Sequence, residues 1–365
     1  MTALSAPGSS FWSPRIAALQ PYVPGEQPRI DNLVKLNTNE NPYPPSPLAI
    51  DAIQRASESG LERYPDPTSM ALREAIAHRH GLNAQQVFVG NGSDEVLAHA
   101  FFAFFQQAEP LLLPDITYSF YKVYAQLYGI ACELQPVGDD LRIDVDALAA
   151  RAQSVDGCAG IVIANPNAPT GIGLPLERIE QLLIACPHRV VLVDEAYVDF
   201  GGESALPLVA LYPNLLVVRT LSKSHSLAGL RVGFACGQSH LIEALTRVKD
   251  SFNSYPLDRL ASAGAIAAIE DERYFESTRK AVMDTREGLS LQLEDLGFEV
   301  LPSQANFVFV RHADHDAAML AAALRERAVL VRHFARPRID QYLRISIGTR
   351  DQCSMLIDAL QTVLG

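Results

Sequence analysis

The sequence predicts an α/β protein in which a mostly parallel, seven-stranded sheet carries helices on both faces and is followed by a smaller α+β domain. Short apolar runs alternate with helical segments along the chain, and each run is apolar throughout, as in strands buried on both sides. A chain of 365 residues with 48% hydrophobic content can also bury a large core. The seven runs are 87–89, 111–113, 131–134, 160–164, 190–193, 215–218 and 232–236.

Composition restricts the possible partners. The formal net charge is −12, which argues against nucleic acid or an anionic membrane surface as a partner. No apolar run reaches the length of a membrane span, and no basic residue precedes an apolar core at the N-terminus, so we expect a soluble, cytoplasmic protein. The five cysteines are widely spaced and include no Cys-x-x-Cys, which argues against a disulfide framework or a zinc site, and we expect no metal.

The chain is expected to divide into three parts. Residues 1–47 form an N-terminal arm and a small-domain segment, 48–255 the large domain, and 256–365 a linking helix and the small C-terminal domain. Helical periodicity places helices at 48–59, 68–80, 239–250, 256–295, 314–327 and 351–363. In the small domain, strands are expected at 298–301, 306–310, 329–332 and 342–348.

Ligands of such sheets bind beyond the carboxyl ends of the strands, so the residues after each run are the first to consider. Gly92, Ser93 and Asp94 follow the first run and begin a helix, where free backbone N–H groups can take a phosphate. An ordinary N-cap at Ser93 is the competing interpretation. Tyr118 follows the second run and is placed to stack on a flat heteroaromatic ring, although aromatic residues in such segments more often belong to the core.

Asp194 follows the fifth run. A carboxylate at the end of a buried strand is costly unless it is paired, and a pyridinium nitrogen is a suitable partner. Tyr197, three residues on, can form a hydrogen bond with a ring oxygen. Asp-Glu after a strand is also typical of a magnesium and ATP site, but no Gly-x-x-x-x-Gly-Lys-Ser/Thr string supports that alternative.

Lys223 follows the sixth run and is the residue around which the site is predicted. Lysine is a good nucleophile toward carbonyls when a nearby cation and partial desolvation lower its pKa, and Arg231 is the candidate cation. The hydroxyls of Ser222 and Ser224 with Arg231 also form a phosphate-binding set. A Schiff-base lysine beside a phosphate clamp suggests pyridoxal phosphate, whereas a loop lysine among serines is the simpler interpretation.

Two arginines are candidates for binding an anion, and one asparagine is a candidate for binding a ring oxygen. Arg344 alternates with apolar neighbours in a predicted strand, which favours a buried anion-binding role. Arg332 also ends a predicted strand. The alternative interpretation is that either arginine lies on the surface. After the fourth run, an asparagine amide can donate to a phenolate oxygen. We assign this contact to Asn167, because the residue directly before Pro-Thr-Gly is Ala168.

Several strings resemble known families. Ser-Lys-x-x-x-x-x-Gly-x-Arg-x-Gly, from Ser222 to Gly233, resembles the cofactor-lysine segment of fold-type I aminotransferases of class I/II. The string at 36–42, Leu-Asn-Thr-Asn-Glu-Asn-Pro, resembles a segment of histidinol-phosphate aminotransferases, as does Arg-Tyr-Pro-Asp at 63–66. The string at 165–171 departs from the family's Asn-Pro-x-Asn-Pro-Thr-Gly at Ala168.

The resemblance covers nearly the whole chain and implies pyridoxal 5′-phosphate, the substrates histidinol phosphate and 2-oxoglutarate, and ping-pong chemistry in which Lys223 moves a proton from Cα to C4′. It also implies a homodimer with shared active sites, in which Tyr64 reaches the cofactor phosphate of the other subunit. The implied cofactor contacts are Tyr64, Gly92, Ser93, Asp94, Tyr118, Asn167, Asp194, Tyr197, Ser222, Lys223 and Arg231, and the implied substrate contacts are Tyr22, Asn39, Arg332 and Arg344.

Other functions are compatible with many of these motifs. An aromatic amino-acid aminotransferase or a threonine-phosphate decarboxylase of the same fold would share most of them. A non-catalytic, ligand-sensing regulatory module would need an attached DNA-binding segment, and the arm has too few residues and too little basic charge for one.

Overall fold

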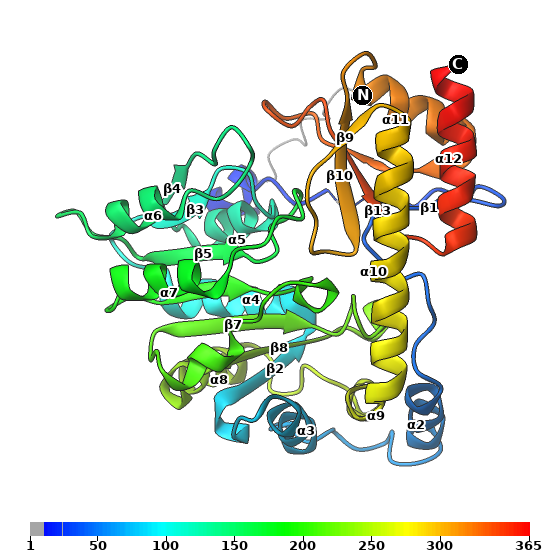
Figure 1. The fold of residues 1–365 in the computed structure, drawn as a ribbon. Coiled ribbons are helices and arrows are strands. Elements are labelled where there is room, and N and C mark those ends of the chain that lie inside the picture. Colours follow the sequence, from blue (N-terminus) through cyan, green and yellow to red (C-terminus); the bar gives the residue numbers. More distant parts are fainter. Residues whose placement is uncertain (1–10, 24) are drawn as a thin grey trace.

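A computed structural model describes residues 11–23 and 25–365, and its centre is the predicted seven-stranded sheet (Figure 1). The strands are β2 (Val87–Asn91), β3 (Leu111–Pro114), β4 (Cys132–Gln135), β5 (Gly160–Ala164), β6 (Val191–Asp194), β7 (Leu215–Thr220) and β8 (Val232–Gly237). Their order across the sheet is β2-β8-β7-β6-β5-β3-β4. β8 alone runs opposite to the other six strands, so the predicted mostly parallel sheet is confirmed.

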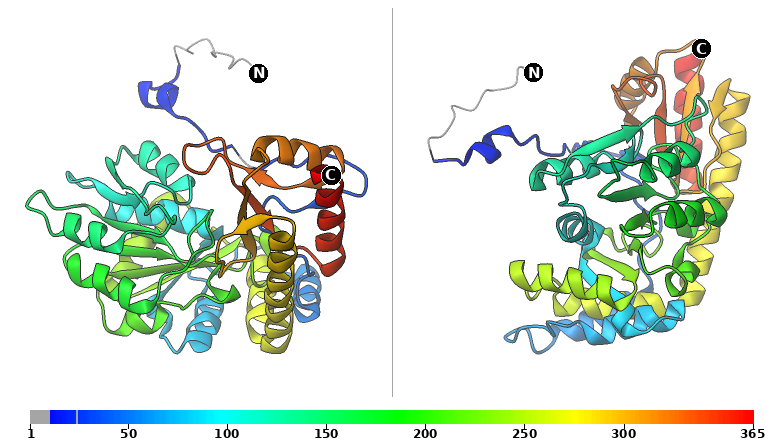
Figure 2. Two further views of the ribbon diagram at one scale, coloured as in Figure 1. Left: turned by 45° about the horizontal axis from the view of Figure 1, so that its top comes forward. Right: turned by 90° about the vertical axis from the view of Figure 1, so that its left-hand side faces the viewer.

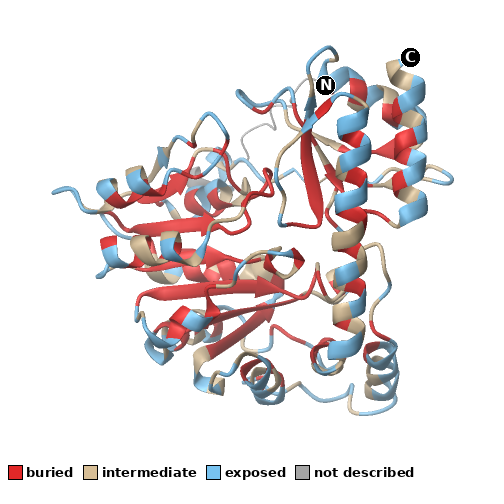
Figure 3. Ribbon diagram, in the orientation of Figure 1, coloured by how far each residue is buried: buried red, intermediate tan, exposed pale blue. Residues whose placement is uncertain are grey.

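Helices cover both faces of this sheet, as the unbroken apolar runs require. One face packs against α4 (Gly92–Phe104), α5 (Phe120–Tyr128) and α8 (Ser239–Phe252), and the other against α3 (Met70–His80), α6 (Val145–Ala152), α7 (Leu176–Ala185) and α9 (Arg259–Glu270). Alternate residues of β5 pack into the two hydrophobic cores. Val162 packs on the first face, and Ile161 and Ile163 pack on the second. Figure 3 shows these strands buried along most of their length.

A smaller sheet lies beside the large one. It consists of β12 (Arg332–His333), β13 (Leu343–Ser346), β10 (Phe307–His312) and β9 (Phe298–Val300), and it packs against α10 (Glu272–Asp295), α11 (Ala317–Glu326) and α12 (Arg350–Leu364). The strand predicted at 329–332 is two strands in two sheets. β11 (Val329–Leu330) pairs with β1 (Val34–Lys35) from the start of the chain, and the chain turns at Val331 to reach β13.

The single helix predicted for 256–295 is two helices, and Asp271 is the reason. Its carboxylate accepts a hydrogen bond from the Tyr274 N–H (3.2 Å), which caps the start of α10 directly after the end of α9. α9 packs against α3 and α2 (Pro47–Ser57), while α10 extends from the level of α9 to the small sheet (Figures 1 and 2). The chain therefore crosses between the two sheets along α10.

The described part of the arm contains a short helix, α1 (Pro14–Ala18), and contacts α5. Gln126 Nε2 donates to the Ala18 carbonyl (2.7 Å), and the Tyr22 ring lies 4.7 Å from the Phe120 ring. Figure 2 shows α1 lying away from the body of the molecule. Short 3-10 helices occupy Ala84–Gln86 (η1), Val198–Phe200 (η2), Leu206–Ala210 (η3) and Ala228–Leu230 (η4). Among the helices of residues 11–23 and 25–365, none has the length and apolar character needed to traverse a bilayer.

Candidate active site

Most of the predicted functional residues meet at one edge of the large sheet, because β2, β3, β5, β6 and β7 all point their carboxyl ends there and antiparallel β8 begins there. A cavity of about 270 Å³ opens at this edge, next to the small sheet. The predicted residues that line it are Tyr22, Asn39, Ser93, Asp94, Tyr118, Asp194, Tyr197, Ser222, Lys223, Arg231, Arg332 and Arg344.

Lys223 lies just beyond β7, with its amine inside the cavity. Its Nζ donates to the Thr38 carbonyl (3.4 Å) and lies 5.9 Å from the centre of the Tyr197 ring. Burial lowers the pKa of Lys223 to about 8, and the charge of Arg344 is the next cause. Arg231, which the sequence suggested as the cation, lowers this pKa less than Arg344 does. An amine with this pKa is neutral in about a tenth of molecules at pH 7, far more often than an ordinary lysine, and a nucleophile or base must be neutral.

Asp194 ends β6, the strand next to β7. Tyr121 Oη donates to its carboxylate (2.8 Å), as does the Ala196 N–H (3.2 Å). Burial nevertheless raises the pKa of Asp194 to about 6, because within the described ranges no basic side chain forms an ion pair with it. The charge of Lys223 offsets this shift only in part. A buried carboxylate that faces a cavity and has no ion-pair partner fits a ligand that brings a cation, such as a protonated ring nitrogen.

The start of α4 forms an anion cradle with Arg231. Gly92 begins the helix with φ +77°, and a Cβ there would lie 2.4 Å from Arg231 Nη2. Arg231 itself adopts the left-handed conformation (φ 56°), and its Nη2 donates to Asp94 (3.1 Å). Asn91 precedes the helix, so Ser93 is not its N-cap. A phosphate would be well held here. It could accept hydrogen bonds from the free N–H groups at the helix start, from the Arg231 guanidinium and from the hydroxyls of Ser93 and Ser222.

Aromatic side chains form the walls between the cradle and Asp194. Tyr118 Oη donates to Asp94 (3.3 Å), and burial raises the pKa of Tyr118 well above its usual value. Tyr197 Oη accepts a hydrogen bond from Asn39 Nδ2 (3.1 Å), and the Asn39 amide oxygen in turn accepts one from Ser346 Oγ (3.0 Å). Asn39 thus orients Tyr197 toward the cavity, in addition to lining it.

Asn167 is not brought to the cavity. Its Nδ2 donates to the Ile116 carbonyl (3.0 Å) and its Oδ1 accepts from Thr117 Oγ1 (3.0 Å), so its amide is used by the segment that follows β3. Ala168 lines the cavity in its place. Of the two side chains predicted to hold a ring oxygen, only Tyr197 is positioned to do so.

The end of the cavity nearest the small sheet is positively charged. Arg344 lies over the rings of Phe307 (5.4 Å) and Phe334 (5.5 Å), and its Nη2 donates to the Asn37 carbonyl (2.8 Å). Its Nε is buried and has no hydrogen-bond partner among residues 11–23 and 25–365. Arg332 lies over the same Phe334 ring at 5.5 Å. Two stacked guanidiniums with an unused donor fit the anionic end of a ligand.

Tyr64 lies outside this cavity. Its side chain is 79% exposed and stacks on Tyr255, with the two ring centres 4.7 Å apart. Within one chain it therefore contacts none of the predicted cofactor ligands, and its role stays a prediction that concerns a second copy.

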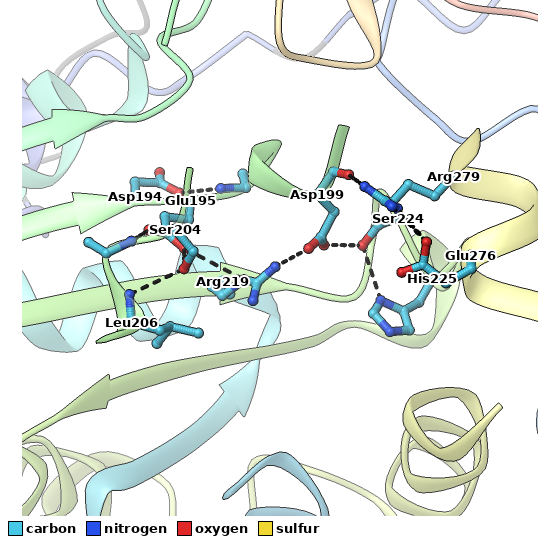
Figure 4. Close-up of polar contacts among 12 residues, drawn as sticks. Asp194, Glu195, Asp199, Ser204, Leu206, Arg219, Ser224, His225, Glu276 and Arg279 are labelled. Carbon is cyan, nitrogen blue, oxygen red and sulfur yellow. Dashed lines mark hydrogen bonds and ion pairs between the residues drawn. The ribbon is translucent and has the colours of Figure 1, made fainter. Parts of the chain in front are cut away.

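Sequence reasoning missed a buried polar network that includes Ser224, the residue after Lys223, and Figure 4 shows this network. Ser224 Oγ donates to Asp199 Oδ2 (2.6 Å), and Asp199 also pairs with Arg219. Glu195 lies 3.9 Å from Arg219 and accepts from Ser204 Oγ (2.7 Å). Ser224 was expected to bind phosphate. Its hydroxyl instead forms a hydrogen bond with Asp199, and this bond anchors the segment that carries Lys223. Nothing in the local sequence around Asp199 signals this contact, because its partner is 25 positions away.

Comparisons with known proteins agree with this geometry. The family model described as "Aminotransferase class I and II" matches residues 31–360. A histidinol-phosphate aminotransferase from Gluconacetobacter diazotrophicus is 62% identical over 98% of both chains, and one from Aromatoleum aromaticum is 60% identical over 98% of this chain and 99% of the relative. A solved histidinol-phosphate aminotransferase from Sinorhizobium meliloti, in complex with pyridoxal-5′-phosphate, superimposes with a TM-score of 0.86 at 25% identity and covers 97% of this chain and 98% of that one.

Proposed function

The chain belongs to the class I and II aminotransferases, and from this premise we propose that it transfers the amino group of L-histidinol phosphate to 2-oxoglutarate with pyridoxal 5′-phosphate as cofactor. The products are imidazole-acetol phosphate and glutamate, in a step of histidine biosynthesis. The observation that carries this proposal is the cavity itself, which is lined by Lys223 and Asp194 together with Arg332 and Arg344. The names of the relatives agree with it.

The residues present fit pyridoxal phosphate. The cradle of Ser93, Ser222 and Arg231 would hold its phosphate. Asp194, a buried carboxylate that has no ion-pair partner, would face its ring nitrogen. Tyr118 would lie on the ring and Tyr197 near its oxygen. When bound, this cofactor supplies an electron-withdrawing ring that stabilises negative charge on the substrate carbon that bears the amine.

The protein's own groups then have distinct tasks. The Lys223 amine would hold the cofactor aldehyde and, when free, would take the proton from the substrate Cα, for which its lowered pKa suits it. The Asp194 carboxylate would favour positive charge on the ring nitrogen. Arg332 and Arg344 hold the substrate's phosphate, since two guanidiniums suit a dianion, and this fixes the Cα–H bond relative to Lys223.

The test is to incubate the protein with pyridoxal phosphate, L-histidinol phosphate and 2-oxoglutarate while glutamate is measured. We expect glutamate to form, with initial rates that give the parallel double-reciprocal lines of a ping-pong reaction. Phenylalanine and threonine phosphate serve as competing amine donors. A higher kcat/KM with phenylalanine, or release of CO2 from threonine phosphate, would instead support the aromatic aminotransferase or the decarboxylase.

The lowered pKa of Lys223 predicts how cofactor uptake depends on pH. Only the neutral amine can attack the aldehyde, so the rate of covalent attachment to cofactor-free protein should rise with pH up to about 8 and level off above it. An ordinary lysine would show a rate still rising at pH 10. Stopped-flow absorbance after mixing with pyridoxal phosphate measures this rate. A profile without a plateau below pH 10 would show that the amine is not perturbed.

We further propose that two copies of the chain form a homodimer with shared active sites, in which Tyr64 of each subunit reaches the cofactor phosphate in the other. Three features support this. Tyr64 is exposed and separated from its own cavity, and the arm exposes the large apolar side chains of Phe11, Trp12 and Val23. Exposed apolar side chains gathered on one segment are typical of an association surface.

Mixing two impaired variants tests this arrangement. Tyr64→Ala should weaken cofactor binding about tenfold, and Lys223→Ala should be inactive. In a mixed dimer, one site then combines an intact Lys223 with an intact Tyr64 from the other subunit, so unfolding and refolding the two variants together should restore up to about a quarter of wild-type activity at limiting cofactor. If the mixture shows no more activity than the separate variants, Tyr64 does not act across an interface.

The division of the chain and its location are also proposals. The three parts proposed are 1–47, 48–255 and 256–365, and the confinement of the large sheet to 87–237 and of the four-stranded sheet to 298–346 supports them. We propose a cytoplasmic location, which suits five cysteines that are all free.

A further inference from the structure

A second cavity of about 300 Å³ adjoins the active site. The two share Tyr22, Tyr118, Ala168, Arg332 and Arg344 as walls. Beyond these, the second cavity lies between the large sheet and the small one: residues 115–119 and α5 form one side, and the 334–339 segment, which follows β12, forms the other. We call this second cavity the vestibule.

The walls of the vestibule carry far more positive than negative charge. The basic residues are Lys122, Arg332, Arg336, Arg338 and Arg344. The single acidic residue, Asp115, is already engaged. Its Oδ1 accepts from the N–H groups of Ile116 and Val137 (both 2.9 Å), and its Oδ2 accepts from Arg338 Nη1 (3.4 Å). Arg338 also donates to the carbonyls of Val137 (3.0 Å) and Gly138 (2.7 Å), so these two charges form a structural link between the walls.

Lys122 and Arg336 are different. Lys122 comes from α5 and Arg336 from the opposite wall, and neither side chain has a hydrogen bond or ion pair within residues 11–23 and 25–365. Both side chains are exposed. Burial and the charge of Arg336 lower the pKa of Lys122, whereas the charge of Asp115 raises it, so Lys122 and Arg336 act on each other across the vestibule. Water screens the repulsion between two exposed cations, so it costs little, but both cations are free to attract an anion placed between them.

The chain as a whole would repel its substrates. Its formal net charge is −12, whereas histidinol phosphate and 2-oxoglutarate both carry anionic groups. A local region of opposite sign at the entrance to a site overcomes such repulsion and raises association rates by about ten- to a thousandfold. Lys122 and Arg336 provide unneutralised charge next to Arg332 and Arg344, where the proposed function places the substrate phosphate.

We propose that the vestibule captures the phosphate monoester of the amine substrate between Lys122 and Arg336 and delivers it to Arg332 and Arg344. This inference rests on the proposed function, since it assumes a phosphorylated substrate. Lys122 and Arg336 are then specificity-determining residues that act on the encounter, before the amine reaches Lys223.

The test compares wild type with Lys122→Gln/Arg336→Gln in the cofactor-loaded enzyme. Stopped-flow absorbance gives the second-order rate constant for reaction with histidinol phosphate between about 10 mM and about 500 mM salt, a range over which the Debye length falls from about 30 Å to a few Å. In wild type this constant should fall steeply with salt. In the double variant it should be about tenfold lower at the lowest salt, fall less steeply, and meet the wild-type value at the highest salt.

Two controls make the result specific. Arg247→Gln/Lys280→Gln also removes two positive charges, but from exposed helix pairs with Glu243 and Asp284, and it should follow wild type at every salt concentration. Lys122→Arg/Arg336→Lys keeps both charges and should restore the steep salt dependence. A double variant with the wild-type rate and salt slope would overturn the vestibule while the proposed function stands. A wild type that does not react with histidinol phosphate would overturn the function itself.

Discussion

Lys223→Ala is expected to reduce the rate of glutamate formation by at least about four orders of magnitude, because one side chain supplies both the nucleophile and the base. Alanine leaves no amine in the cavity, and Lys223 is the lysine that lines it. The absorbance band of cofactor joined to the lysine should disappear. Cofactor should still bind, since the cradle of Ser93, Ser222 and Arg231 is untouched. Glutamate formation and the absorbance spectrum measure the two effects.

Chemical rescue separates loss of the amine from loss of structure. A small primary amine such as methylamine can enter the space left by the side chain and act as a base, so it should restore part of the Lys223→Ala activity in proportion to its concentration. Lys280→Ala removes an exposed lysine paired with Asp284 and should leave the rate at the wild-type value. Turnover by Lys223→Ala above about one hundredth of wild type would contradict the assigned role.

The large sheet could be predicted closely because its strands are buried on both faces and are therefore apolar without interruption. The predicted run at 215–218 corresponds to β7, which continues to Thr220. Elements whose ends depend on distant partners could not be predicted in this way. The split at Val331 is set by two different sheets, and the break at Asp271 by one capping carboxylate inside an otherwise helical pattern.

In the site, the strand-end argument placed Lys223 and Asp194 in one cavity, because parallel topology alone brings strand ends together. It could not assign the direction of side chains within loops. Asn167 and Ser224 lie beside cavity residues, yet both form hydrogen bonds away from it. Their partners, Ile116 and Asp199, are remote in sequence, and only the packed structure shows that these polar groups are already satisfied.

Asp194→Asn should lower activity about a thousandfold and, in the cofactor-free protein, raise stability at pH 8. The first effect follows because a neutral amide cannot keep a ring nitrogen protonated. The second follows because burial raises the pKa of Asp194 from 3.8 to about 6, so its ionised form costs the folded state about 3 kcal/mol, at 1.36 kcal/mol per pH unit. Asparagine avoids this cost and can still accept the Tyr121 hydrogen bond. Turnover assays and thermal unfolding of cofactor-free protein measure the two effects.

The sign of the stability effect depends on pH and provides its own control. A raised carboxyl pKa favours the folded state below about pH 4, and this contribution is lost as pH rises through about 6. The advantage of Asp194→Asn should therefore be several degrees in Tm at pH 8 and clearly smaller at pH 5.

Asp199→Asn is the matched change. Arg219 holds the pKa of Asp199 below its usual value, so this variant should be less stable than wild type at pH 8. If Asp194→Asn also lowers Tm at pH 8, or keeps turnover within tenfold of wild type, Asp194 is not the uncompensated carboxylate that the ring nitrogen neutralises.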